Sequence, residues 1–175
     1  MICEKINMLL ILFIMKVGFK MIPRGFFVTS GKAYSHISHL NAFDQALINA
    51  EIAQCNLVPV SSIIPEGCVQ KEMKHIPIGA ITYTVIARMD GIEGENIGSA
   101  ISWIVEKSNG WGIVAETHGY MKETALLEIA EWKIKEMAKI REIEIGKINY
   151  VYETLEVPMD NYGCVIAALV FLPEV

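Results

Sequence analysis

The stretch GCVIAALVF, residues 163–171, decides the fold that we expect of this chain. It is almost wholly apolar, which is typical of a strand covered on both of its faces. The chain has 175 residues, of which 53% are hydrophobic, and this is enough for one domain with a sizeable core. We therefore expect an α/β (α+β) fold, an αββα-type sandwich in which helices cover mainly antiparallel sheets.

Hydrophobic periodicity and turn signals predict the remaining elements. In the segment 96–106, Ile97, Ala100, Ile101 and Ile104 share one face at helical spacing. Pro59 places a strand in the segment 57–64 at a sheet edge or an irregularity. The expected helices are 41–53, 96–106 and 122–143, and the further strands are 25–29, 57–64, 80–88, 111–116 and 147–153.

The net charge and the cysteines indicate which partners and which cellular compartment to expect. The net charge of −5 and the pI of about 5.4 give no electrostatic reason to expect nucleic acid. None of the four cysteines is paired in a CxxC spacing, so a zinc ribbon or a redox motif is not expected. Three of them lie in apolar stretches, which favours buried free thiols in a reducing compartment, the cytoplasm. The four are Cys3, Cys55, Cys68 and Cys164.

The first twenty residues differ in character from the rest. Their apolar run, from about residue 8 to 15, is too short to span a bilayer, and no signal-peptide cleavage site follows it. We expect residues 1–20 to be an extension or a mis-called start, and residues 21–175 to form a single domain. A membrane-associating segment at 1–20 is the alternative, and otherwise no membrane contact is expected.

The stretch NLVPVSSIIP, residues 56–65, carries the chemistry. Ser61 and Ser62 set two adjacent hydroxyls into an apolar run that Asn56 begins. The plain interpretation is a strand whose hydroxyls bond the backbone, with Asn56 as a polar cap at its start. That interpretation leaves open why two hydroxyls interrupt an apolar run beside an asparagine that could polarise a carbonyl.

A family resemblance favours self-cleavage. LNAFDQALINAEIAQCNLVPVSSIIP resembles the signature of the pyruvoyl-dependent arginine decarboxylases, and further segments match in order over about residues 21–171. These are IPIGA, GENIGSAIS (which resembles a helix after a Gly–Glu turn), WGIVAETHG, EIAEWKIKEMAKIR and GCVIAALVF.

The resemblance implies a reaction and a role for each residue. Ser62 Oγ would attack the carbonyl of Ser61, cutting the chain into 21–61 and 62–175 and leaving a covalent pyruvoyl group at position 62. This cofactor would form a Schiff base with L-arginine, which is converted to agmatine and CO₂ in polyamine biosynthesis. Asn56 is tied to processing, Glu116 is the expected proton donor, and Asp44, with Ser61, would bind the substrate. Thr117, beside Glu116, departs from the commoner family pattern.

Alternatives remain open for these residues. Asn41 is a candidate N-cap of a helix, with Asp44 closing a capping-box-like contact three residues on. Glu116 is also a candidate surface carboxylate at a strand end. The HxxH spacing of His36 and His39 lacks a third ligand and predicts a solvated loop, with no metal site.

Alternatives also remain for the protein. A decarboxylase of another amino acid and an unprocessed, non-catalytic paralogue are the rival functions. The resemblance implies a homo-oligomer, a trimer or a dimer of trimers, with active sites between subunits.

Overall fold

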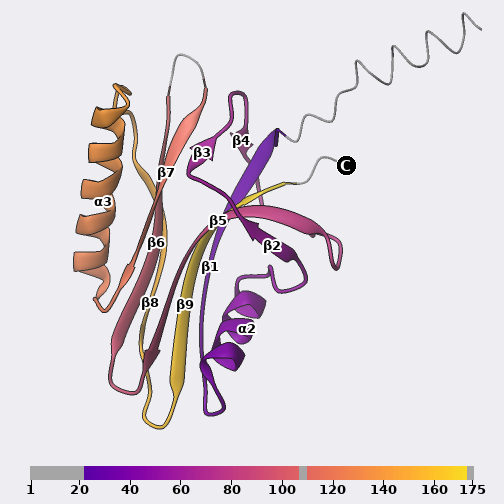
Figure 1. Cartoon of the computed structure of the whole chain (residues 1–175), viewed down its shortest axis with the longest axis vertical. Helices are drawn as coiled ribbons and strands as arrows, with labels where there is room; N and C mark the ends of the chain where they lie inside the picture. Colours follow the sequence, from indigo (N-terminus) through magenta and orange to yellow (C-terminus); the bar gives the residue numbers. More distant parts are fainter. Residues whose placement is uncertain (1–21, 107–109, 173–175) are drawn as a thin grey trace, which may run out of the picture.

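The fold is a four-layer sandwich of helix, sheet, sheet and helix (Figure 1). It is described here from a computed structural model, which defines residues 22–106 and 110–172. The first sheet, sheet A, has the strand order β2 (Asn56–Pro59), β5 (Ile81–Ile92), β9 (Tyr162–Phe171), β1 (Gly25–Ser35) and β4 (Val69–Gln70). The second, sheet B, has the order β3 (Ile63–Ile64), β7 (Gly112–Gly119), β6 (Asn96–Val105) and β8 (Asn149–Glu156).

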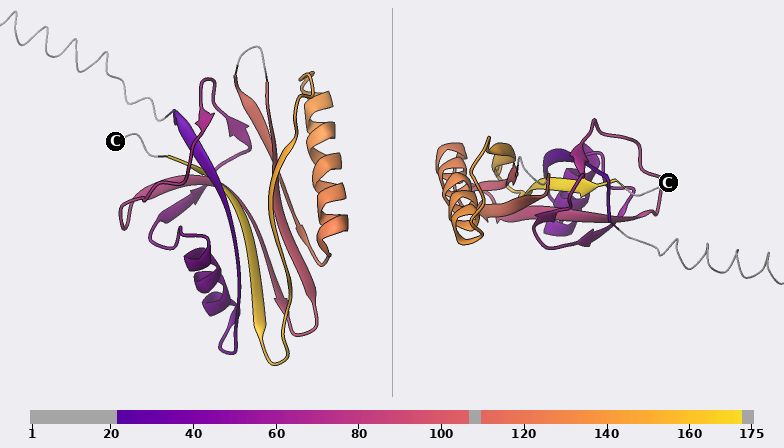
Figure 2. Two further views of the ribbon diagram at one scale, coloured as in Figure 1. Left: turned by 180° about the vertical axis from the view of Figure 1, so that it is seen from behind. Right: turned by 90° about the horizontal axis from the view of Figure 1, so that it is seen from above.

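The two long helices cover the outer faces of the sheets. Helix α2 (His39–Asn49) packs on β1 and β9 of sheet A, and α3 (Glu123–Ile140) packs on β6 and β7 of sheet B. The view from behind in Figure 2 shows α2 and α3 at opposite sides of the paired sheets. Most strand pairs are antiparallel, and β1–β4 and β2–β5 are the parallel pairs. The predicted αββα sandwich is therefore confirmed.

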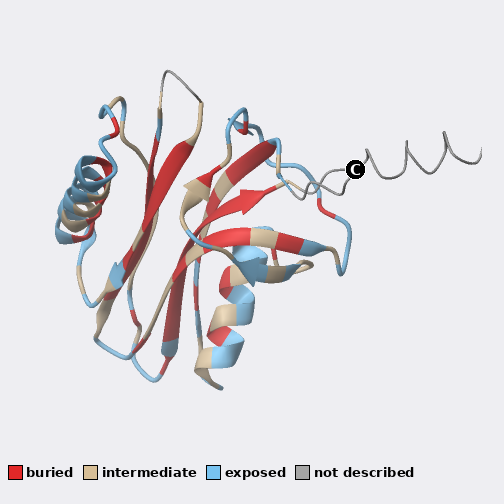
Figure 3. Cartoon of the chain, turned by 45° about the horizontal axis from the view of Figure 1, so that its top comes forward, coloured by how far each residue is buried: buried red, intermediate tan, exposed pale blue. Residues whose placement is uncertain are grey.

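Strand β9 holds the layers together. Its residues alternate between two cores: Ala167, Leu169 and Phe171 face sheet B, whereas Ile166 and Ala168 face α2. Figure 3 shows buried residues along the facing strands of both sheets. A strand covered on both faces needs apolar residues at every position, which explains its sequence.

The predicted helix at 96–106 is wrong, because this segment forms strand β6. Ile97 and Ile101 face the space between the sheets, whereas Ala100 and Ile104 face α3. A central strand covered on both faces shows no polar alternation, so its apolar residues also matched a helical spacing by chance.

The single strand predicted at 57–64 is also wrong, because the chain changes sheets within it. Strand β2 ends in sheet A at Pro59, and β3 begins in sheet B at Ile63. Ser61 and Ser62 make the crossing. The expected strand at 25–29 is longer than predicted and runs to Ser35. The strand expected at 80–88 is also longer than predicted, because β5 continues to Ile92.

Helix α2 begins earlier than predicted. Ser38 is its N-cap, with a hydroxyl that accepts from the Asn41 N–H at 3.3 Å, so the prediction that Asn41 caps the helix is wrong. Asp44 then lies in the second turn, beyond the reach of an N-terminal capping pair. At the C-terminal end, Thr29 Oγ1 donates to the Ala50 carbonyl at 2.9 Å and fixes the helix to β1.

In the part of the chain that the structure describes, neither helix has the length and apolarity that a membrane span requires. The predictions about residues 1–20 and Cys3 fall outside the described residues. Cys55, Cys68 and Cys164 are free thiols, and the last two are buried.

Candidate active site

The peptide bond between Ser61 and Ser62 lies at the point where the chain leaves one sheet for the other. On one side, the Val60 N–H donates to the Thr84 carbonyl of β5 at 2.9 Å. On the other, the Ser62 carbonyl accepts from the Val114 N–H of β7 at 3.0 Å. Each flank of this bond is therefore held by a different sheet, while Ser61 is exposed and Ser62 is half-buried.

The carbonyl oxygen of Ser61 is also occupied. It accepts from the Ile63 N–H at 2.9 Å, so the backbone closes a tight three-residue turn centred on Ser62. The carbonyl carbon that a Ser62 hydroxyl would attack thus belongs to a polarised C=O group. Nothing in the sequence pattern pointed to this donor, because a backbone N–H has no side-chain signature.

Glu116 lies on β7 and faces the space between the sheets. Its neighbour Val114 belongs to the core between the sheets, whereas Ala115 packs toward α3, so alternation turns Glu116 inward. Continuing the β3–β7 register by one residue puts Ser62 opposite Val114, and opposite side chains share a face. The structure therefore places Ser62 and Glu116 on the same face of sheet B, two positions apart along β7.

The surroundings of Glu116 favour the protonated form of its carboxyl group. Burial raises the pKa of its carboxyl, and the nearby His118 and Lys133 lower it by less. Lys133, on α3, also donates from Nζ to the Glu116 backbone carbonyl at 3.1 Å. Helix α3 thereby fixes the strand position that carries the carboxyl group, a contact that the sequence did not suggest.

A second polar group on this face was also missed by sequence reasoning. The hydroxyl of Ser99 on β6 is fully buried and finds no hydrogen-bond partner among the described residues. Ser99 pairs with His118 and therefore lies diagonally from Glu116 on the same face. A serine within an apolar segment was the available signal, but the helix prediction obscured which face it occupies.

Asn56 is separated from the serine pair in this chain. It begins β2, whose two ends are about 10 Å apart at the usual rise per residue, and Ser61 lies beyond the far end of that strand. Its side-chain amide donates to the Gly79 carbonyl at 2.8 Å.

Asp44 lies elsewhere again. It is an exposed residue of α2, on the outer face of sheet A, and its carboxylate makes no hydrogen bond or ion pair within the described residues. One chain therefore brings Ser61, Ser62 and Glu116 together, and it leaves Asp44 and Asn56 apart from them.

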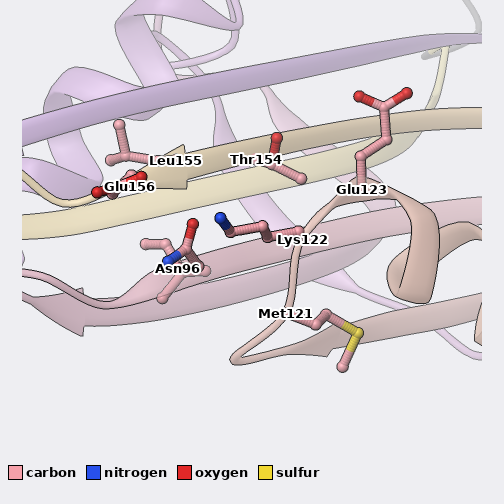
Figure 4. Close-up of a pocket in the computed structure, with 8 residues that line it drawn as sticks. Asn96, Met121, Lys122, Glu123, Thr154, Leu155 and Glu156 are labelled. Carbon is pink, nitrogen blue, oxygen red and sulfur yellow. The ribbon is translucent and has the colours of Figure 1, made fainter.

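Other polar sites lie away from the serine pair. A pocket of about 270 Å³ opens where β6 begins, β8 ends and α3 starts, and none of the predicted site residues lines it. Figure 4 shows Asn96, Lys122 and Glu156 around this pocket. His36 Nδ1 lies 2.8 Å from the Asp160 carbonyl, and His39 packs edge-on against Tyr162. Among residues 22–106 and 110–172, no group of three or more His, Cys, Asp or Glu side chains is arranged to hold a metal ion.

Comparison with known proteins gives the family. A model of the pyruvoyl-dependent arginine decarboxylases matches residues 25–175. A Methanopyrus kandleri protein described by that name is 29% identical over 150 residues, which covers 86% of this chain and 97% of the relative. A relative from Methanococcus aeolicus, with the same description, is 32% identical over 84% of this chain and 88% of its own length. A relative from Methanocaldococcus jannaschii, with the same description, is 33% identical over 74% of this chain and 78% of its own length. The chain belongs to the pyruvoyl-dependent arginine decarboxylase family.

Proposed function

We propose that this chain cleaves itself between Ser61 and Ser62 and then converts L-arginine to agmatine and CO₂. The observation that carries the proposal is the position of the serine pair at the crossing between the sheets, on the same face as Glu116. Membership of the family indicates arginine as the substrate and a pyruvoyl group as the cofactor. The geometry supports Ser62 as the source of that group.

The residues present fit the formation of a pyruvoyl group at position 62. Ser62 Oγ bonds to the Ser61 carbonyl carbon, the C–N bond breaks, and the hydroxyl proton passes to the nitrogen, leaving an ester. Loss of the Ser62 α-proton then breaks the Cβ–Oγ bond and frees Ser61 as a carboxylate. Water replaces the nitrogen at position 62, which leaves as ammonia, and the ketone remains. Asn56 is proposed to assist this cleavage.

In the decarboxylation, the pyruvoyl carbonyl supplies the electron sink for loss of CO₂. Glu116 holds the proton that returns to the substrate α-carbon, and the burial that raises its pKa favours this donor form. Apolar neighbours such as Ile101, which is buried and pairs with Glu116, contribute to the burial that favours this form.

Substrate binding requires more than one subunit in this proposal. Asp44 is exposed and has no partner among the described residues, so its carboxylate is available to bind a planar guanidinium in a bidentate manner, and Ser61 lies beside the reacting group. Because one chain leaves Asp44 and Asn56 apart from Glu116, we infer a homo-oligomer, a trimer or a dimer of trimers, with sites at its interfaces. The free thiols of the described cysteines support a reducing, cytoplasmic location.

The test compares two single-atom deletions in the serine pair. Ser62→Ala removes the proposed nucleophile, so this variant should stay whole and release no CO₂ from arginine. Ser61→Ala keeps both the reacting carbonyl and the Ser62 hydroxyl, so it should still be cut. Denaturing gels and CO₂ release from arginine, ornithine, lysine, histidine and aspartate are the measurements. Cleavage of the Ser62→Ala chain would overturn the proposal, and release from another substrate alone would identify the rival decarboxylase.

A further inference from the structure

The Ile63 N–H lies outside the hydrogen-bond ladder between β3 and β7. In an extended strand the N–H and C=O groups of one residue point to the same side, and those of the next residue point to the other. The Ser62 carbonyl points to β7, where it accepts from the Val114 N–H. The Ile63 N–H therefore points away from the sheet ladder, and it donates to the Ser61 carbonyl oxygen at 2.9 Å.

We propose that the Ile63 backbone N–H is the oxyanion donor of the self-cleavage step. This inference rests on the proposed function. As the Ser62 Oγ–C bond forms, the π electrons of the Ser61 carbonyl move onto its oxygen. That oxygen is the atom to which the Ile63 N–H already donates. When the C–N bond breaks, the electron pair returns to the carbon and the ester carbonyl is restored.

The donor is held in place before the reaction. Hydrogen bonds from Val60 to sheet A and from Val114 to the Ser62 carbonyl fix the backbone on both sides. A donor that needs no reorganisation stabilises developing charge more than a mobile one. Within one chain, the side-chain amide of Asn56 is instead engaged with the Gly79 carbonyl, so the backbone N–H is the donor that this chain itself supplies.

The donor belongs to the backbone, so the side chain at position 63 should matter little to cleavage. The Ile63 side chain packs against the core beneath α3, away from the reacting carbonyl. Ile63→Val should therefore be cut at close to the wild-type rate.

The decisive experiment replaces the Ile63 N–H by oxygen. The full chain is made with the α-hydroxy acid analogue of isoleucine at position 63, refolded from denaturant, and followed by the appearance of the two fragments. We expect cleavage to slow by about 10²–10³-fold, the usual effect of losing one oxyanion donor.

Two matched analogues separate this effect from a general loss of backbone bonding. A hydroxy acid at Val60 removes the bond to Thr84, and one at Val114 removes the bond to the Ser62 carbonyl, which the ester at position 63 also weakens. Both should be cut within about tenfold of the wild-type rate. Cleavage of the position-63 analogue at the wild-type rate, or equal slowing of all three, would overturn the inference. A wild-type chain that is never cut would instead refute the proposed function.

A measurement on an unmodified backbone covers the case in which the analogue fails to fold. In the uncut Ser62→Ala chain, the Ile63 amide hydrogen should exchange slowly with solvent because it is hydrogen-bonded to the Ser61 oxygen. Exchange as fast as that of an exposed loop amide would contradict the inference.

Discussion

Glu116 follows apolar residues on β7, and the partial burial of its carboxyl group shifts its pKa. Burial is the largest effect and raises the pKa, while the nearby His118 and Lys133 lower it by less. The form that donates a proton is the protonated acid. Turnover should therefore fall as the pH rises through this raised pKa.

Removing the positive charge of Lys133, one of the two residues that lower the pKa of Glu116, tests this assignment. Lys133→Met should raise the pKa of Glu116 further, so the fall in kcat should move to higher pH. Lys135→Met is the matched control, because Lys135 pairs with Glu131 on the exposed side of the same helix. The measurement is the pH profile of kcat for arginine in both variants and in the parent protein.

Glu116→Gln is the end point of this series. It should be cut normally but lose about 10²–10⁴-fold in turnover, because an amide cannot supply the acidic proton. If the pH at which kcat falls is unchanged in Lys133→Met, or shifts equally in Lys135→Met, another group controls the pH profile of kcat.

For individual residues, sequence was informative where a side chain carries the chemistry. Ser61, Ser62 and Glu116 were predicted from the family motifs and their roles stay predictions, while the structure shows that Ser62 and Glu116 share one face of sheet B. The hydrogen bond of the Ile63 N–H depends on how the chain turns, and the Lys133 contact depends on where α3 packs. Neither could be predicted from the type of residue.

The packing of α2 on β1 depends on one small residue. Gly31 on β1 lies beneath α2, where an added Cβ would collide with the Ala46 carbonyl oxygen and lie 2.9 Å from the Ala50 nitrogen. Backbone atoms of a helix cannot move aside as a flexible side chain would. The helix can therefore lie this close to the strand only while position 31 has no side chain.

Gly31→Ala should destabilise the fold by about 3 kcal/mol through this overpacking. Urea unfolding of the uncut Ser62→Ala chain measures the effect, since that background avoids dissociation of fragments. Ser30→Ala is the control, because the neighbouring residue points to the opposite face of β1, and it should cost less than about 1 kcal/mol. Equal effects of the two substitutions would contradict the close packing of α2.

Elements were predictable where polar and apolar residues separate clearly. The long helix was expected at 122–143 and runs over Glu123–Ile140 because one face meets sheet B and the other meets solvent. Strand β6 was missed because it is covered on both faces and has no polar side. The division of the segment 57–64 between two sheets depends on contacts with β5 and β7, which are distant in sequence.

The two proposed fragments are interleaved in the folded molecule. Strand β1 belongs to the fragment before the cut. It lies between β9 and β4, which both belong to the fragment after the cut. Strand β2 likewise pairs with β5 across the cut. Because these pairings and the core around β9 do not involve the Ser61–Ser62 bond, the fragments should stay together after cleavage until the protein is denatured.

The intact mass of purified, active protein tests the central proposal most directly. Under denaturing conditions we expect two species, a smaller one that ends at Ser61 and a larger one that begins at position 62 with a ketone and reacts with a hydrazide. Under native conditions the two should travel as one particle. A single species with the mass of the uncut chain, in a sample that decarboxylates arginine, would contradict the proposal.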